Sequence, residues 1–221
     1  MSRCEPKVRW WSATTRSLSR FAPARRPHAR RRLRLECLED RTMLSTIALS
    51  VNTLLDDPTG VPISGYTTLR DAITQADFDT ANPYVITFAV TGTIDLNSPL
   101  PDLNNNIDIE GPGAADLTVQ RDPNLSPYSA FSVFTVNSGA TVSLFGLTIS
   151  GGYYYNGIIG GGGLNNSGAA TVSDSVFSND SGGYGGAIDN QSGGTLKVTD
   201  STFSNNNADG GGGIFNWGTT T

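Results

Sequence analysis

The chain has little cysteine and little histidine. Its two cysteines, Cys4 and Cys37, and its one histidine, His28, all lie within the first 45 residues. The remaining residues therefore have no thiol with which to form a disulfide. They also lack the side chain that most often serves as a general base or a zinc ligand.

Long apolar runs and basic residues are also scarce. No apolar run approaches the length of about 18 residues that a transmembrane helix needs. Beyond residue 45 there are three basic residues, Arg70, Arg121 and Lys197, against 16 acidic ones, which gives a net charge of −13. We therefore expect this part to repel nucleic acid and anionic lipid.

Residues 1–45 carry the opposite charge. They hold 12 basic and four acidic residues, a net charge of +8, and the run RRPHARRRLR alone contains six arginines. The segment has no hydrophobic periodicity, so we expect it to be disordered. A nucleic-acid-binding tail is one interpretation. An export leader is the interpretation we prefer, because the apolar stretch TMLSTIALSV follows the arginines as a signal-peptide core would.

An internal repeat marks the C-terminal part. The segment TVSDSVFSND recurs as KVTDSTFSNN, and equivalent residues such as Val172 and Val198 are 26 positions apart. The tripeptide that precedes each copy begins at Leu164 and at Ile188, and a third copy begins at Ile214. A fixed period of this length is typical of a solenoid.

Alternation of apolar and polar residues within each copy indicates strands. Leu196 and Val198 are predicted to face one side and Lys197 and Thr199 the other, with a change of phase at Asp200. Frequent Gly, Asn, Ser and Asp exclude helical repeats. The sequence thus predicts an all-β fold, a parallel β-helix with about three short strands per coil.

Stacking of equivalent residues explains the repeat. We predict inward-facing columns of apolar side chains, each contributing roughly 1.5–3 kcal/mol when neighbouring coils cover it. We also predict asparagine columns, because Asn tolerates left-handed backbone and its amide can hydrogen bond the amide one coil away. These columns are Leu144, Val172 and Val198; Ile149, Phe177 and Phe203; Asn166, Asn190 and Asn216; and Asn179 and Asn205.

Calcium binding by the Asn and Asp residues is the alternative to this structural role. A calcium β-roll has the motif Gly-Gly-x-Gly-x-Asp, and the nearest match, which begins at Gly182, has Ala187 in place of the Asp. We therefore expect no cofactor, with calcium as the open alternative.

The entry to the repeats has a different pattern. Residues 46–84 are predicted to form an N-terminal cap that contains a short helix at about 68–78, with Thr67 or Thr68 as N-cap and Asp71 in the first turn. Residues 85–221 are predicted to form the coils, beginning with strands at 85–88, 93–96, 107–109 and 117–119. The last coil lacks a cap, so we expect a fragment of a longer protein.

Several stretches together resemble a known family. YTTLRDAITQAD, IDIEGPGAADLTV and FTVNSGATVSLFGLTISGG resemble the CSLREAI-domain family of bacterial surface proteins, which have right-handed parallel β-helix repeats akin to polymorphic outer-membrane and choice-of-anchor proteins. LECLEDRTMLS resembles the export motif of large planctomycete-type proteins. The resemblance implies that the parallel β-helix is right-handed, a pectate-lyase-like solenoid. It also implies an exported protein of the cell surface, outer membrane or extracellular space. Thr67 stands where the family has cysteine, and no catalytic residue can be carried over.

Enzymatic function is the competing class. Polysaccharide lyases of this fold need acidic calcium ligands beside an Arg or Lys base, and glycosidases need a pair of carboxylates. Asp174 and Asp200 stack at one corner, but repetition alone would produce that pair, and Lys197 is the only basic residue after residue 121. Fold analogy cannot decide the question.

Aromatic residues near the corners are candidates for binding. Tyr153, Tyr154 and Tyr155 are predicted to lie in an insertion between coils, with Tyr184 and Trp217 near later corners. Such rings can stack on a surface glycan or anchor another surface protein, or they can simply cover glycine-rich turns. The glycine runs at 160–163 and 210–213 lack the Lys-Ser/Thr of a phosphate loop, so we expect them to supply corner backbone angles.

These observations lead to one hypothesis and one alternative. The hypothesis is a non-catalytic, exported β-helix that acts as a structural or adhesive stalk. The alternative is a carbohydrate-active β-helix, either an enzyme or a glycan-binding module.

Overall fold

The computed structural model of the chain describes residues 45–61, 63–154 and 160–221. The described residues all belong to one compact unit, residues 42–221. The predictions about the leader, with Cys4, Cys37 and His28, and about Tyr155 lie outside the described residues.

Short strands make up nearly all of the regular structure. Their bounds are β1 Ile47–Val51, β2 Tyr84–Phe88, β3 Gly92–Leu96, β4 Asn106–Glu110, β5 Leu117–Arg121, β6 Phe134–Val136, β7 Thr141–Phe145, β8 Thr148–Ser150, β9 Tyr153–Tyr154, β10 Leu164–Asn166, β11 Ala169–Ser173, β12 Val176–Ser178, β13 Ser181–Gly182, β14 Ile188–Asn190, β15 Thr195–Thr199, β16 Thr202–Ser204, β17 Asn207–Ala208, β18 Ile214–Asn216 and β19 Thr219–Thr220. The four predicted early strands correspond to β2, β3, β4 and β5.

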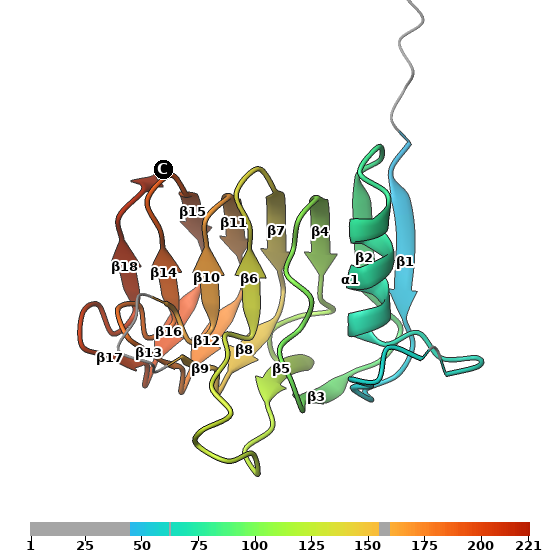
Figure 1. Cartoon of the computed structure of the whole chain (residues 1–221), viewed down its shortest axis with the longest axis horizontal. Helices are drawn as coiled ribbons and strands as arrows, with labels where there is room; N and C mark the ends of the chain where they lie inside the picture. Colours follow the sequence, from blue (N-terminus) through green and yellow to red (C-terminus); the bar gives the residue numbers. More distant parts are fainter. Residues whose placement is uncertain (1–44, 62, 155–159) are drawn as a thin grey trace, which may run out of the picture. The chain divides into compact units, whose positions relative to one another are not determined.

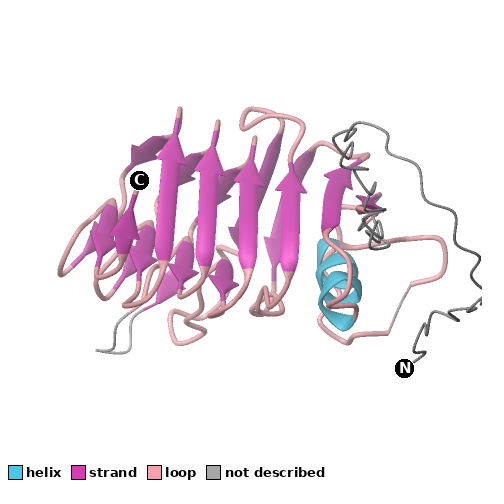
Figure 2. Cartoon of the chain, turned by 90° about the horizontal axis from the view of Figure 1, so that it is seen from above, coloured by secondary structure: helices cyan, strands magenta, loops and turns pink. Residues whose placement is uncertain are grey.

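The strands assemble into four parallel sheets (Figure 1). The longest has the order β1-β2-β4-β7-β11-β15-β19, and the others have the orders β16-β12-β8-β5-β3, β18-β14-β10-β6 and β17-β13-β9. One coil consists of β10, β11, β12 and β13, and the next consists of β14 to β17 (Figure 1). Figure 2 shows strands of successive coils side by side. The chain is therefore a right-handed parallel β-helix, as predicted. The very short fourth strand of each coil was not predicted.

Equivalent residues stack in register. Val172 aligns with Leu144 in the coil before and with Val198 in the coil after, and Phe177 aligns in the same way with Ile149 and Phe203. The rings of Phe177 and Phe203 lie 5.3 Å apart and nearly parallel, at 11°. Both predicted apolar columns are confirmed.

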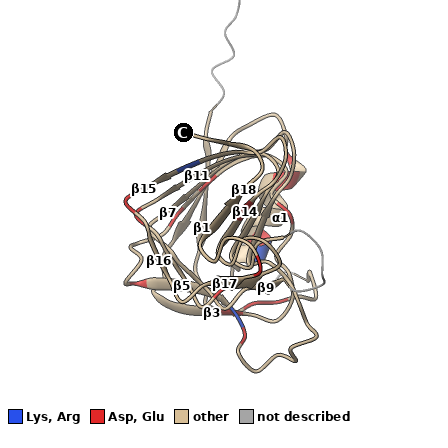
Figure 3. Cartoon of the chain, turned by 90° about the vertical axis from the view of Figure 1, so that its left-hand side faces the viewer, with Lys and Arg blue, Asp and Glu red and all other residues tan. Residues whose placement is uncertain are grey.

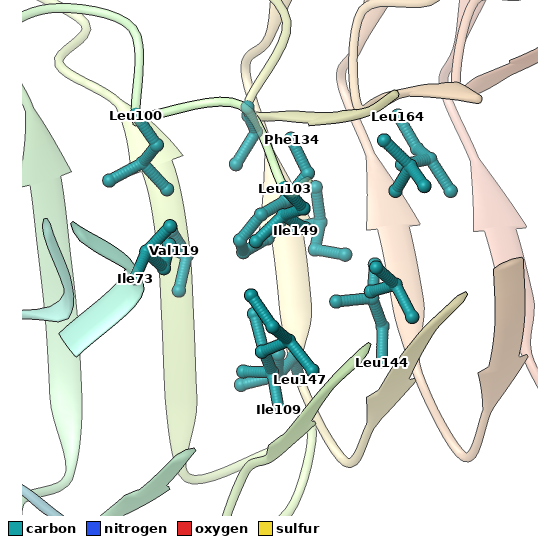
Figure 4. Close-up of a cluster of buried hydrophobic side chains, with 14 of the residues drawn as sticks. Ile73, Leu100, Leu103, Ile109, Val119, Phe134, Leu144, Leu147, Ile149 and Leu164 are labelled. Carbon is teal, nitrogen blue, oxygen red and sulfur yellow. The ribbon is translucent and has the colours of Figure 1, made fainter. Parts of the chain in front are cut away.

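The columns meet in one continuous interior. Leu144 from β7, Ile149 from β8 and Leu164 from β10 point into it from three different sheets, and all three are fully buried (Figure 4). Because each coil contributes only a few side chains, burial depends on the coils on either side.

The N-terminal helix α1, Leu69–Phe78, forms as predicted. Thr68 is its N-cap: the Thr68 side chain accepts from the Asp71 nitrogen, and the Asp71 carboxylate accepts from the Thr68 nitrogen. Its apolar face, which includes Ile73, packs against β1 and β2 at the N-terminal end of the coils (Figure 1). At its other end the Asn105 amide donates to the Ala76 carbonyl.

A buried ion pair fixes this helix to the coil. Arg70 donates from Nε to Asp56 at 2.8 Å and from Nη2 to the other Asp56 oxygen at 3.0 Å, and its guanidinium also reaches the Ser98 and Pro99 carbonyls. Only 9% of Arg70 is exposed. These bonds tie the helix to the segment that precedes it, through Asp56, and to the loop between β3 and β4, through Ser98 and Pro99.

Phe177→Ala should lower the free energy of unfolding by about 3–5 kcal/mol, because it leaves a cavity between Ile149 and Phe203. Chemical denaturation measures this loss as a lower denaturant midpoint with an unchanged m value. Phe145→Ala is the matched control, because Phe145 is 42% exposed on an outer sheet face. An equal loss in both variants would contradict the stacked interior.

Candidate functional site

Three aromatic side chains gather beside the last coils and are named the aromatic cluster: Tyr184, Phe215 and Trp217. The ring of Tyr184 lies 4.9 Å from that of Phe215 and 6.3 Å from that of Trp217, and Phe215 and Trp217 are 5.3 Å apart. Trp217 is 54% exposed and Tyr184 is 37% exposed. The structure thus brings together two of the predicted binding residues and adds Phe215, which the sequence analysis missed.

The other tyrosines lie elsewhere. Tyr153 and Tyr154 form β9, which pairs with β13 through Ser181 and Gly182, so they belong to a coil and the prediction that they lie in an insertion is wrong. A Cβ on Gly160 would overlap the Tyr154 ring, and one on Gly210 would lie 3.1 Å from the ring of Tyr184. These rings therefore cover glycines directly, which is the structural role that the sequence left open.

The glycine runs have a different role from the one predicted. None of residues 160–163 and 210–213 has a positive φ, so corner angles do not explain them. A Cβ on Gly162 would lie 2.6 Å from the Ser181 nitrogen and 2.7 Å from the Gly186 oxygen. Gly162 is therefore needed because the backbones of neighbouring coils approach it too closely for a side chain.

The asparagine columns separate into two kinds. Asn166 donates from Nδ2 to Oδ1 of Asn190 at 2.6 Å, and Asn190 donates to Asn216 at the same distance. Asn166 and Asn190 are fully buried in strands. Asn179 and Asn205 instead have left-handed backbone, with φ of 58° and 55°. The amide ladder and the left-handed corners were both predicted, but they occur in different columns.

The predicted acidic pair has a backbone role. Asp174 and Asp200 both have φ of 49°, a conformation that Asp adopts more readily than most residues. In the part of the chain that the structure describes, no group of three or more His, Cys, Asp and Glu side chains is placed to hold a metal ion.

Two buried carboxyl groups were missed by the sequence analysis. Asp180 is 1% exposed and Asp189 is fully buried. Each leaves one oxygen, Oδ2 of Asp180 and Oδ1 of Asp189, without a hydrogen-bond partner among the described residues. Burial raises the pKa of Asp180 from 3.8 to about 8, and burial raises the pKa of Asp189 to about 6.

The repeat explains the state of Asp180. One coil later its place is taken by Asn206, whose Oδ1 accepts from the Asp180 nitrogen at 2.9 Å and whose Nδ2 donates to the Phe177 carbonyl at 3.0 Å. Asp180 makes the equivalent of the first of these two bonds: its Oδ1 accepts from the nitrogen of Gly152, the aligned residue of the preceding coil, at 2.9 Å. The counterpart of the Phe177 carbonyl in the preceding coil is the carbonyl of Ile149, which aligns with Phe177, but Oδ2 of Asp180 makes no hydrogen bond with the described residues. Only a protonated carboxyl group can donate to a carbonyl.

Stability should therefore fall as the pH rises from about 4 to about 8. In that range the folded chain keeps a proton on Asp180 that the unfolded chain has lost, so Asp180 alone lowers the free energy of unfolding by up to about 1.4 kcal/mol per pH unit. Asp189 adds a slope of the same sign below about pH 6. Asp180→Asn should remove the slope between about pH 6 and 8 and stabilise the chain at pH 8, because an amide carries no charge and can also donate a hydrogen bond. The measurement is chemical denaturation at several pH values.

Asp200→Asn is the control, because Asp200 is exposed and an Asn can keep its left-handed backbone. In Asp200→Asn the free energy of unfolding should still decrease as the pH rises. Loss of stability at pH 8 in Asp180→Asn would contradict a protonated Asp180.

Comparisons with known proteins add no family: no family model matches the chain, and no curated protein or solved structure matches it either. Within the described residues, no helix is both long enough and apolar enough to cross a bilayer.

Proposed function

We propose that this chain is an exported, non-catalytic β-helix protein of the cell surface, outer membrane or extracellular space, with a structural or adhesive role. The aromatic cluster carries the proposal. It places partly exposed Tyr and Trp rings side by side on a regular scaffold, and such rings supply most of the binding energy at many protein and glycan contacts.

The repeated polar residues also support a structural role. Asn166 and Asn190 are occupied in the amide ladder, and Asp174 and Asp200 occupy left-handed corners. Repetition of the coil thus accounts for these residues without any chemistry at them.

Charge distribution is consistent with this proposal. The described residues contain three basic residues, Arg70, Arg121 and Lys197, and the acidic residues, red in Figure 3, lie at several places around the coil. Such a surface does not attract nucleic acid or anionic lipid. The export signal and the CSLREAI-type resemblance remain part of the proposal and rest on the sequence motifs alone.

Trp217→Ala and Tyr184→Ala should each weaken attachment of the labelled chain to bacterial envelope preparations or to a glycan panel by about tenfold or more, as truncation of a binding hot spot does. Phe145→Ala is the control, because Phe145 is exposed but lies outside the cluster on β7. Circular dichroism checks the fold of each variant.

Two results would contradict the proposal. One is attachment that is unchanged in both cluster variants. The other is product release from acidic polysaccharides with added calcium that Asp174→Ala or Asp200→Ala abolishes, which would favour the carbohydrate-active alternative.

A further inference from the structure

Arg121, at the end of β5, is a buried cation held by neutral groups. Only 8% of it is exposed. Its Nε donates to the Ser129 carbonyl at 2.9 Å, and its Nη2 donates to the carbonyls of Ser126 at 2.6 Å and Leu125 at 3.3 Å. All three acceptors belong to the loop between β5 and β6, which stands out from the coils (Figure 1).

No carboxylate of the described residues neutralises this charge. Their one ion pair joins Arg70 and Asp56, and the adjacent Asp122 instead accepts from Asn124. Two aromatic rings contribute weakly: the guanidinium carbon lies 5.9 Å from the centre of the Phe131 ring and 6.0 Å from that of Tyr153. The described hydrogen bonds use Nε and Nη2 and do not involve Nη1. A buried guanidinium without an acid is unusual, because desolvation of a charge is costly unless the charge is paired.

A cleft of about 390 Å³ opens beside this guanidinium. Its volume lies within the range of small-ligand sites. Three successive coils line it, because Arg121 ends β5, Gly151 and Gly152 separate β8 from β9, and Asn179 and Ser181 lie one coil further. The protruding loop adds an apolar wall, formed by Pro123, Leu125 and Pro127.

Polar groups of the cleft are unoccupied by the described residues. No described hydrogen bond uses the side-chain amide of Asn179 or the hydroxyl of Ser181. Both residues bond through the backbone: the Asn179 nitrogen donates to the Ser204 carbonyl, and the Ser181 nitrogen donates to the Gly152 carbonyl. The Tyr153 ring lies in the same lining. One cation, one amide, one hydroxyl and an aromatic ring on an apolar wall form the usual composition of a small polar-ligand site.

We propose that this cleft binds an acidic sugar, with its carboxylate on Arg121 and its ring against Tyr153 and the proline wall. A monoanion matches the single cation, whereas a doubly charged phosphate would find no second positive group among the lining residues. Asn179 and Ser181 would hydrogen bond the ring hydroxyls, and the apolar face of a sugar ring suits an aromatic side chain. The inference is independent of the aromatic cluster, which contributes no residue to the cleft.

The test is saturation-transfer NMR on the full chain with glucuronate, compared with glucose and acetate at equal concentration. We expect glucuronate to bind, and glucose and acetate to bind at least about tenfold more weakly, since each lacks either the charge or the ring. Equal binding of all three, or no binding of glucuronate, would overturn the proposal.

Two variants locate the site. Arg121→Gln should reduce glucuronate binding about tenfold or more, but it also removes bonds that hold the loop. Asn179→Gly avoids that problem, because glycine keeps the left-handed backbone (φ 58°) and removes only the side chain. Asn205→Gly is its matched control one coil later, outside the cleft. Weaker binding in Asn179→Gly alone supports the site, and an equal effect in both Asn variants contradicts it.

Trp217→Ala separates this inference from the proposed adhesive role. Glucuronate binding should survive in Trp217→Ala, since Trp217 does not line the cleft. Loss of glucuronate binding in that variant would place the sugar at the aromatic cluster instead and would overturn the cleft assignment.

Discussion

Register between neighbouring coils is the constraint on which the whole molecule depends. Each strand pairs in parallel with the equivalent strand of the next coil, so each side chain lies on its own counterpart. An inward-facing apolar residue is therefore covered by the residues aligned with it in the neighbouring coils, as Val172 is by Leu144 and Val198. An amide can be buried for the same reason, because its partner is an identical amide, as in the column of Asn166, Asn190 and Asn216.

The same constraint makes exceptions informative. Asp180 stands where the next coil has Asn206, so a carboxyl group occupies a buried position at which the following coil has an amide. Burial raises the pKa of Asp180 to about 8, because it removes the water that would stabilise a carboxylate. Arg121 is a second exception. The next coil has Gly151 at the equivalent position, and the coil after that has Asn179, so neither neighbour repeats the guanidinium. Its hydrogen bonds come instead from one loop, between β5 and β6.

Much of the fold could be predicted from the sequence because the repeat exposes it directly. Val172 with Val198 and Phe177 with Phe203 are visible as identical letters at one spacing, and Thr68 with Asp71 forms a local signal for the start of a helix. Tyr153 and Tyr154 were misplaced because their strand has two residues, too few to alternate. The glycine runs were misinterpreted because close approach of backbones from different coils leaves no local mark in the sequence.

The candidate sites were harder to predict. Phe215 joins Tyr184 from the next coil, and the cleft draws Arg121, Tyr153 and Ser181 from three coils. Such groupings depend on where corners and loops lie in space, and no repeat fixes these. Asp180 did carry a signal, since SND in one copy faces SNN in the next. That substitution indicates a buried polar site only once the burial of the position is known.

The stacked interior is tested most directly by a double-mutant cycle between Phe177 and Phe203, whose rings lie 5.3 Å apart. Phe177→Leu, Phe203→Leu and the double variant are compared with the parent chain by chemical denaturation. Direct stacking predicts a coupling free energy of about 0.5–1.5 kcal/mol. Strict additivity of the two single losses would show that these residues do not lie on one another and would contradict the account.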